Sequence, residues 1–236
     1  MHTIHTQAIN TQLVRRIRSY CRREGRNTSA REETLISLWP RYGISVEQKN
    51  ILELDTIFKR HAPRVLEIGF GDGKSLLQMA LSHPERDFIG IEVYRTGVAS
   101  LLMAIEELGI SNLRLICSDA VDVLANNLSN SSLASVQIFF PDPWPKKRHH
   151  KRRLIQPSFL SLAHQKLEVG GILHLATDWK EYAEHMMSVI SSTSGFENLA
   201  GKHQYSLKPD YRPLTKYEER GKRLGHLSWD LIFRRI

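Results

Sequence analysis

The fold follows from the stretch Arg64-Val-Leu-Glu-Ile-Gly-Phe-Gly-Asp-Gly73. Its first five residues are typical of a buried strand, and an apolar stripe at helical spacing begins at Leu76. Between them lie three glycines in the pattern G-x-G-x-G. A glycine-rich turn that joins a strand to a helix lets the backbone come close to a bound ligand. The stretch therefore predicts an α/β domain with a ligand site after its first strand.

The same alternation continues along the chain. Strand patterns occur at residues 87–92, 113–117, 136–140 and 171–176, and apolar stripes at helical spacing lie between them. Such alternation predicts a mostly parallel sheet with helices on both faces and its ligand site at the carboxyl ends of the strands. Residues 227–234 instead alternate with period two, which predicts a half-buried antiparallel strand at the sheet edge.

The positive charge is concentrated in two segments. The chain has 236 residues, and 33 lysines and arginines exceed 25 acids by eight. Residues 1–31 and residues 146–153 each carry a net charge of +6, so the rest of the chain carries −4. Clustered basic residues on an acidic body indicate a polyanionic partner. We expect a basic, flexible arm at residues 1–40 and one domain at 41–236. The arm's composition is also typical of a solvated tail or an organelle transit peptide.

Composition excludes other classes of protein. Hydrophobic residues make up 41% and charged residues 25%, which is ordinary for a globular domain. No apolar stretch reaches the length of a membrane span, so we expect no membrane association. The only two cysteines, Cys21 and Cys117, favour a reducing compartment, and we expect the cytoplasm.

Acids follow the first three predicted strands. Glu67 precedes the glycines, Glu92 ends the second strand and Asp119 follows the third. A dinucleotide fingerprint would need its third glycine at Lys74 and gives no role to Glu67. G-x-G-x-G after an acid resembles the first motif of class I S-adenosylmethionine-dependent methyltransferases. That resemblance implies a Rossmann-like, seven-stranded sheet and a cofactor site formed by Glu67, Gly69, Gly71, Glu92, Asp119 and Asp142. Asp119 also fits a helix N-cap.

A proline-stiffened turn follows the fourth predicted strand. Asp142-Pro-Trp-Pro145 resembles the D-P-P-[Y/F/W] motif of methyltransferases that act on nitrogens of bases. In that motif an acid accepts a hydrogen bond from the base and an aromatic ring packs on its face. Asp142 is therefore the expected catalytic residue, and Trp144 the expected aromatic partner. A stiff surface turn is the structural alternative.

The run from Phe140 to Arg153 resembles the signature of the tRNA (guanine-N7)-methyltransferase family. Residues 15–28, 176–179 and 212–226 resemble further parts of that family. The resemblance implies methyl transfer from S-adenosyl-L-methionine to guanosine N7 at position forty-six of tRNA. It assigns the substrate to Lys146, Asp178, Thr215, Lys216, Tyr217 and Glu218. The RNA-binding run would be Lys147, Arg148, His149, His150, Lys151, Arg152 and Arg153.

Alternatives remain for these assignments. Asp178 with Glu181, and Thr215 with Glu218, have the spacing of helix capping boxes. The paired histidines suggest a metal, but no cysteine or acid stands at ligand spacing beside them, so we expect none.

A base-amine methyltransferase and a non-catalytic RNA-binding protein on the same fold are the rival functions. The sequence leaves monomer and homodimer open.

Overall fold

The computed structural model describes residues 17–20, 28–46, 50–215, 218 and 227–236. Its strands are β1 (Arg64–Ile68), β2 (Asp87–Ile91), β3 (Leu113–Ile116), β4 (Leu133–Phe139), β5 (Leu167–Thr177), β6 (Phe196–Asn198) and β7 (Trp229–Arg235). Its α-helices are α1 (Ser29–Tyr42), α2 (Leu54–Phe58), α3 (Lys74–Ser82), α4 (Arg95–Glu107), α5 (Ala120–Asn126), α6 (Pro157–Lys166) and α7 (Lys180–Ser191). A short 3-10 helix, η1 (Lys147–Arg152), leads into α6.

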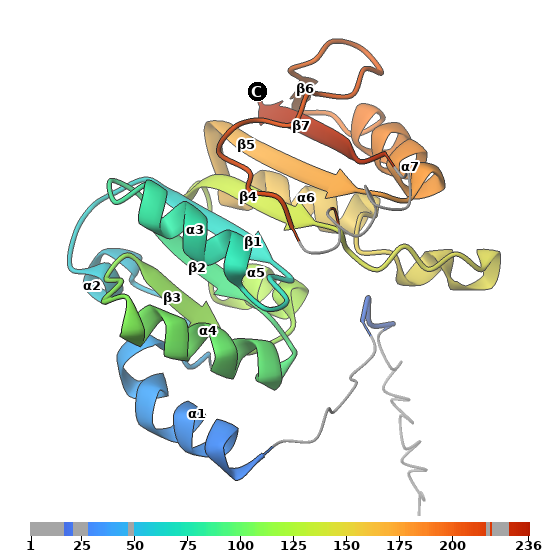
Figure 1. Cartoon of the computed structure of the whole chain (residues 1–236). Helices are drawn as coiled ribbons and strands as arrows, with labels where there is room; N and C mark the ends of the chain where they lie inside the picture. The colour runs from blue at the N-terminus through green and yellow to red at the C-terminus, as the bar shows by residue number, and fades with distance from the viewer. Residues whose placement is uncertain (1–16, 21–27, 47–49, 216–217, 219–226) are drawn as a thin grey trace, which may run out of the picture.

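The strands form one seven-stranded sheet in the order β3-β2-β1-β4-β5-β7-β6 (Figure 1). β1 to β5 are parallel, and β7 runs antiparallel to both β5 and β6. The order reverses beside β1, where the chain crosses to β4. In such sheets ligands bind outside the carboxyl ends of the strands at this switch point. The predicted Rossmann-like class I fold is confirmed.

Helices cover both faces of the sheet (Figure 1). One apolar core lies under α1, α3 and α4, and a second core lies under α2, α5, α6 and α7. β1 and β2 are buried along their whole length, as expected for parallel strands covered on two sides. Among the described residues, no helix has the length and apolar character needed to cross a bilayer.

Two parts of the fold differ in detail from the sequence pattern. The antiparallel C-terminal strand is present, but β6 pairs with its outer side, so β7 lies one strand in from the edge. The expected boundary after residue 40 falls inside α1, whose Leu35 and Tyr42 are buried against the domain. α1 therefore belongs to the packed body.

Candidate functional site

The glycine turn between β1 and α3 is built as a backbone cradle. Gly69 and Gly71 both have positive φ, at 78° and 61°. L side chains rarely adopt this conformation, so glycine is required for the turn. The amide of Gly71 donates to Oε2 of Glu92 at 2.9 Å, which joins the turn to the end of β2. The cradle therefore lies at the carboxyl ends of the two central strands.

Gly97 is a site residue that the sequence analysis missed. It lies in the first turn of α4, where an added Cβ would fall 1.9 Å from the carbonyl oxygen of Gly71. Only glycine lets α4 come this close to the cradle. The sequence carries no local signal for this contact, because the two residues meet only after β2 has returned to the sheet.

Glu92 organises the end of β2. Its carboxylate accepts hydrogen bonds from the amides of Gly71, Val93 and Tyr94 at 2.9, 2.7 and 3.1 Å. Burial raises the pKa of Glu92, the three amides partly counter that shift, and the charge of Asp142 adds to it. Asp142 therefore contributes to the electrostatic environment of Glu92.

Glu67 is a buried acid that forms no salt bridge with any residue the structure describes. Its side chain belongs to β1 and the residue is 3% exposed. Its Oε2 atom has no hydrogen-bond partner among the described residues. Burial, followed by the charges of Glu92 and Asp72, raises its pKa from 4.5 to about 8. A buried carboxylate oxygen without a partner is costly, and a cationic ligand group would satisfy it.

Asp119 lies at the end of β3 and caps α5. Its Oδ1 accepts from the amide of Val121 at 2.9 Å, which confirms the N-cap alternative. Arg18 contacts the same carboxylate and lies 2.7 Å from Oδ2 of Asp122. Arg18, from the N-terminal segment, therefore contacts Asp119, the acid that the family resemblance assigns to the cofactor.

The turn after β4 is held in an unusual backbone conformation. Phe140 and Trp144 have positive φ, at 53° and 47°, although neither is glycine. The amide of Phe140 donates to Ala176 of β5 at 2.8 Å, and the indole nitrogen of Trp144 donates to the carbonyl of Ser19 at 3.0 Å. Asp142 lies between these two points and is exposed. The turn thus presents the expected catalytic carboxyl to solvent beside Glu92.

The basic run forms η1 directly after this turn. Lys146, Lys147, Arg148 and Lys151 are exposed, and His149 and His150 are half-buried. The guanidinium of Arg152 lies 4.4 Å from the centre of the Trp144 ring. Arg153 differs from the others, because its side chain is buried. Across the part of the chain that the structure describes, no three His, Cys, Asp or Glu side chains could together hold a metal ion.

The predicted substrate residues lie on two segments. Asp178 directly follows β5, whose Ala176 pairs with Phe139 of β4, so Asp178 and Asp142 share one edge of the sheet. The alternative in which Asp178 starts a capping box is wrong, because Trp179 is the N-cap of α7 and makes no side-chain cap. Lys216 and Tyr217 lie outside the described residues.

Thr215 and Glu218 are joined, and Glu218 is buried. The amide of Glu218 donates to Oγ1 of Thr215 at 3.2 Å, as a capping box predicts. The carboxylate, however, pairs with Arg212, at 2.7 and 3.2 Å. In this structure Glu218 therefore faces the protein interior.

Arg212 is the centre of a buried ionic network that the sequence analysis missed. It is 0% exposed and also binds both carboxylate oxygens of Asp230, at 2.7 and 2.9 Å. His174 contacts Asp230 through Nε2 at 2.8 Å and Tyr211 through Nδ1 at 2.9 Å. The period-two pattern placed Asp230 on the polar side of a half-buried strand. The structure buries it, because the loop that carries Arg212 covers that side of β7.

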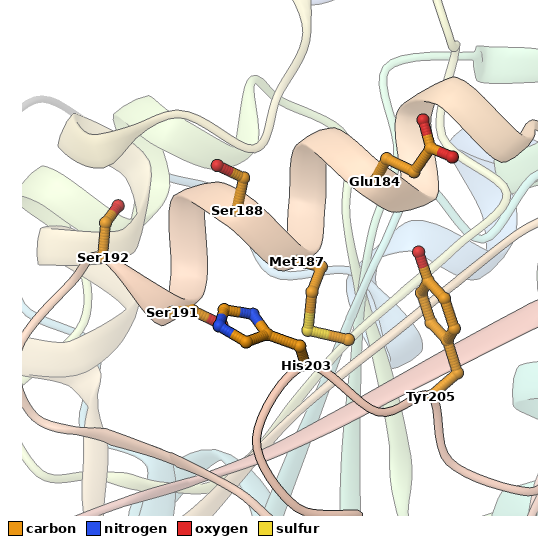
Figure 2. A pocket seen from close by; sticks show the side chains of 7 residues that line it. All are labelled: Glu184, Met187, Ser188, Ser191, Ser192, His203 and Tyr205. Atoms are coloured by element: carbon orange, nitrogen blue, oxygen red, sulfur yellow. The ribbon is translucent and has the colours of Figure 1, made fainter.

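A separate surface hollow of about 360 Å³ lies along α7 (Figure 2). It is lined by Glu184, Met187, Ser188, Ser191, Ser192, His203 and Tyr205. None of the predicted site residues lines it, and we assign the chemistry to the carboxyl edge of the sheet.

Comparison with known proteins gives the family. A family model described as "Putative methyltransferase" matches residues 61–231. A tRNA (guanine-N(7)-)-methyltransferase of Alcanivorax borkumensis is 54% identical, over 94% of this chain and 92% of that protein. A tRNA (guanine-N(7)-)-methyltransferase of Aeromonas hydrophila is 53% identical, over 95% of this chain and 94% of that protein.

Solved structures share the fold at low sequence identity. An antibiotic-related methyltransferase has a TM-score of 0.59 and 16% identity, over 82% of this chain and 96% of that one. The 16S rRNA methyltransferase KamB has a TM-score of 0.56 and 13% identity, over 83% and 99%. The glycine cradle and the acids lie at the switch point of the same sheet, and relatives that match nearly the full length share more than half of their residues with this chain. This chain therefore belongs to the tRNA (guanine-N(7)-)-methyltransferase family.

Proposed function

We propose that this protein transfers the methyl group of S-adenosyl-L-methionine to N7 of a guanosine in tRNA, at position forty-six of the variable loop. The observation that carries the proposal is that Glu67, Glu92 and Asp142 lie toward the carboxyl ends of β1, β2 and β4, with the basic helix η1 directly after Asp142 in the chain. A cationic cofactor fits the acids, and a polyanionic substrate fits the helix.

The residues present fit this cofactor. S-adenosyl-L-methionine, when bound, supplies a methyl carbon activated by a positively charged sulfur. The unpartnered oxygen of Glu67 would accept from its ammonium group, and Glu92 would accept from the ribose hydroxyls. Asp119 would meet the adenine, and Gly69 and Gly71 would let the backbone close on the ligand.

The proposed reaction needs no proton to be removed from the attacking nitrogen. Guanine N7 attacks with a free lone pair and loses no proton, so no strong general base is needed. Asp142 would accept from the guanine edge and stabilise the positive charge that develops on the purine. Its exposure and its closeness to Glu92 suit a group that acts between substrate and cofactor. Alignment of N7, methyl carbon and sulfur would supply much of the rate.

The exposed cations of η1 would hold the RNA beside this turn. Lys147, Arg148 and Lys151 are exposed on one short helix that begins five residues after Asp142. Each phosphate that they neutralise releases counterions and adds affinity that salt weakens. Trp144, between Asp142 and η1, would pack on a base with the ring face that Arg152 does not cover.

Chemical mapping of the product tests the proposal. Unmodified tRNA is incubated with the protein and S-adenosyl-L-methionine, then treated with borohydride and aniline, which cleave RNA at N7-methylguanosine. We expect one cleavage, at the variable-loop guanosine. An Asp142→Asn reaction and a reaction without cofactor are the controls. Methyl incorporation without cleavage would instead indicate a base amine as acceptor, as the D-P-P-[Y/F/W] resemblance allows.

A calorimetric titration separates the remaining rival. A non-catalytic RNA-binding protein would bind tRNA but give no heat with S-adenosyl-L-methionine. The exposure of Asp142 and the unpartnered oxygen of Glu67 favour cofactor binding.

A further inference from the structure

Arg153 ends the basic run but has a different environment from the rest of it. It is 3% exposed, whereas Lys147, Arg148 and Lys151 are all exposed. Burying an arginine is costly unless its charge and its N–H groups are satisfied. Its contacts therefore indicate what the residue does.

Those contacts all lie within the protein. Nε of Arg153 donates to the carbonyl oxygen of Pro143 at 2.9 Å. Nη2 donates to Oε1 of Glu181 at 3.2 Å, and the guanidinium lies 5.0 Å from the centre of the Tyr182 ring. Glu181 and Tyr182 belong to the first turn of α7. Arg153 thus ties the turn after β4 to the helix that follows β5.

The carbonyl that Arg153 contacts belongs to Pro143, which lies between Asp142 and Trp144. The turn is strained at both ends, because Phe140 and Trp144 have positive φ. Such a conformation is unfavourable for a residue with a side chain, so the turn persists only where its surroundings hold it. The bond from Phe140 to Ala176 secures its start, and the bond from Arg153 secures the carbonyl just after Asp142.

We propose that Arg153 is a positioning residue for methyl transfer, which holds the Pro141–Trp144 turn and through it the Asp142 carboxyl, and that it does not bind tRNA phosphates. The inference rests on the proposed function, because Asp142 is assigned through it. With Nε bonded to the Pro143 carbonyl and Nη2 to Glu181, the Arg153 guanidinium is engaged within the protein and not with the RNA. In an in-line transfer, a small displacement of Asp142 reduces turnover more than binding.

A matched pair of variants separates positioning from RNA binding. Arg153→Met and Lys151→Met each remove one positive charge from the same run. We expect Arg153→Met to lower kcat about tenfold or more and to leave tRNA affinity within about twofold. Lys151→Met should instead raise the KM for tRNA and reduce the salt dependence of tRNA binding by about one counterion. Arg153→Lys should recover part of the lost kcat, because an ammonium can still donate to the Pro143 carbonyl.

Glu181→Gln supplies a second test that does not endanger folding, because the Glu181 side chain is 52% exposed. If Arg153 positions the turn, loss of this ion pair should lower kcat. If Arg153 binds RNA and does not position the turn, kcat should stay at the wild-type value; kcat is the deciding readout, because Glu181 also lies 3.4 Å from His150 of the basic run and its removal can tighten tRNA binding in either case.

The proposal is overturned if Arg153→Met matches Lys151→Met in KM and salt dependence while kcat stays at the wild-type value. It is also overturned if Arg153→Lys fails to recover any kcat while the unfolding temperature of both Arg153 variants matches the wild type. The wild-type protein is assayed first by borohydride and aniline cleavage. Absence of cleavage there would refute the proposed function, and the positioning role with it, before any variant is compared.

Discussion

Replacing Glu67 by glutamine should change how the stability of this protein depends on pH. Glu67 is buried in β1, one of its oxygens has no described partner, and its pKa is raised to about 8. A carboxyl with a higher pKa in the folded protein than in the unfolded chain binds its proton more tightly when folded. The stability that this proton provides is fully present below pH 4.5 and is lost as the pH rises through about 8.

The size of the effect follows from the shift. A change from 4.5 to about 8 corresponds to about 5 kcal/mol over the whole window. Between about pH 5.5 and about pH 7.5, the wild type should lose about 2.5 kcal/mol of unfolding free energy relative to Glu67→Gln. Glutamine has nearly the same shape and carries no charge, so its own contribution does not vary in this range.

Urea unfolding followed by circular dichroism at several pH values measures the difference. It is done without cofactor, on the wild type, on Glu67→Gln and on Glu107→Gln, which removes an exposed carboxyl of α4 as the control for losing one acid. The reasoning is refuted if Glu67→Gln and wild type keep a constant difference in unfolding free energy from pH 5.5 to pH 7.5. A bound ammonium group should favour the ionised form, so cofactor titration near neutral pH should release protons from the wild type and fewer from the variant.

Three further predictions concern catalysis, RNA binding and the cradle. Asp142→Asn should lower kcat about a hundredfold with little change in cofactor affinity, as measured by single-turnover methylation and calorimetry; equal loss of both would contradict its role at the substrate. Lys147→Ala should weaken tRNA binding and flatten its salt dependence in filter-binding assays, and an unchanged salt slope would exclude a phosphate contact. Gly97→Ala should abolish calorimetric cofactor binding, because its Cβ would overlap the Gly71 carbonyl, and should destabilise the fold by about 1–3 kcal/mol in thermal unfolding. Met103→Ala, at an exposed position of the same helix, is its control, and cofactor binding by Gly97→Ala at wild-type affinity would refute the contact.

The fold was predictable because its determinants are local. A buried strand, a glycine turn and a helical stripe each occupy a few consecutive residues, and their repetition fixes a parallel sheet. β6 escaped prediction because its three residues, two half-buried and one exposed, are too few to establish a period. Its presence is what moves β7 one place in from the edge.

The acids at the strand ends were predictable for the same reason, since each follows a recognisable strand. What the sequence could not show was which charges are buried. Arg153 stands in a run of exposed cations, and only the packing of α7 against the turn sets it apart. Arg212 meets Asp230 across a segment that has no periodic pattern, and Gly97 meets Gly71 after a whole strand has intervened. Contacts of this kind depend on the assembled tertiary structure.

The burial of α1 has a practical consequence for shortened proteins. A version that begins at residue 41 would remove Leu35 from the core and uncover the cluster that it completes under α4. Loss of activity in such a protein would then report misfolding instead of the role of the basic arm. Truncations meant to isolate the arm should stop before Ser29, which already deletes six of the seven arginines in residues 1–31 and leaves the helix whole.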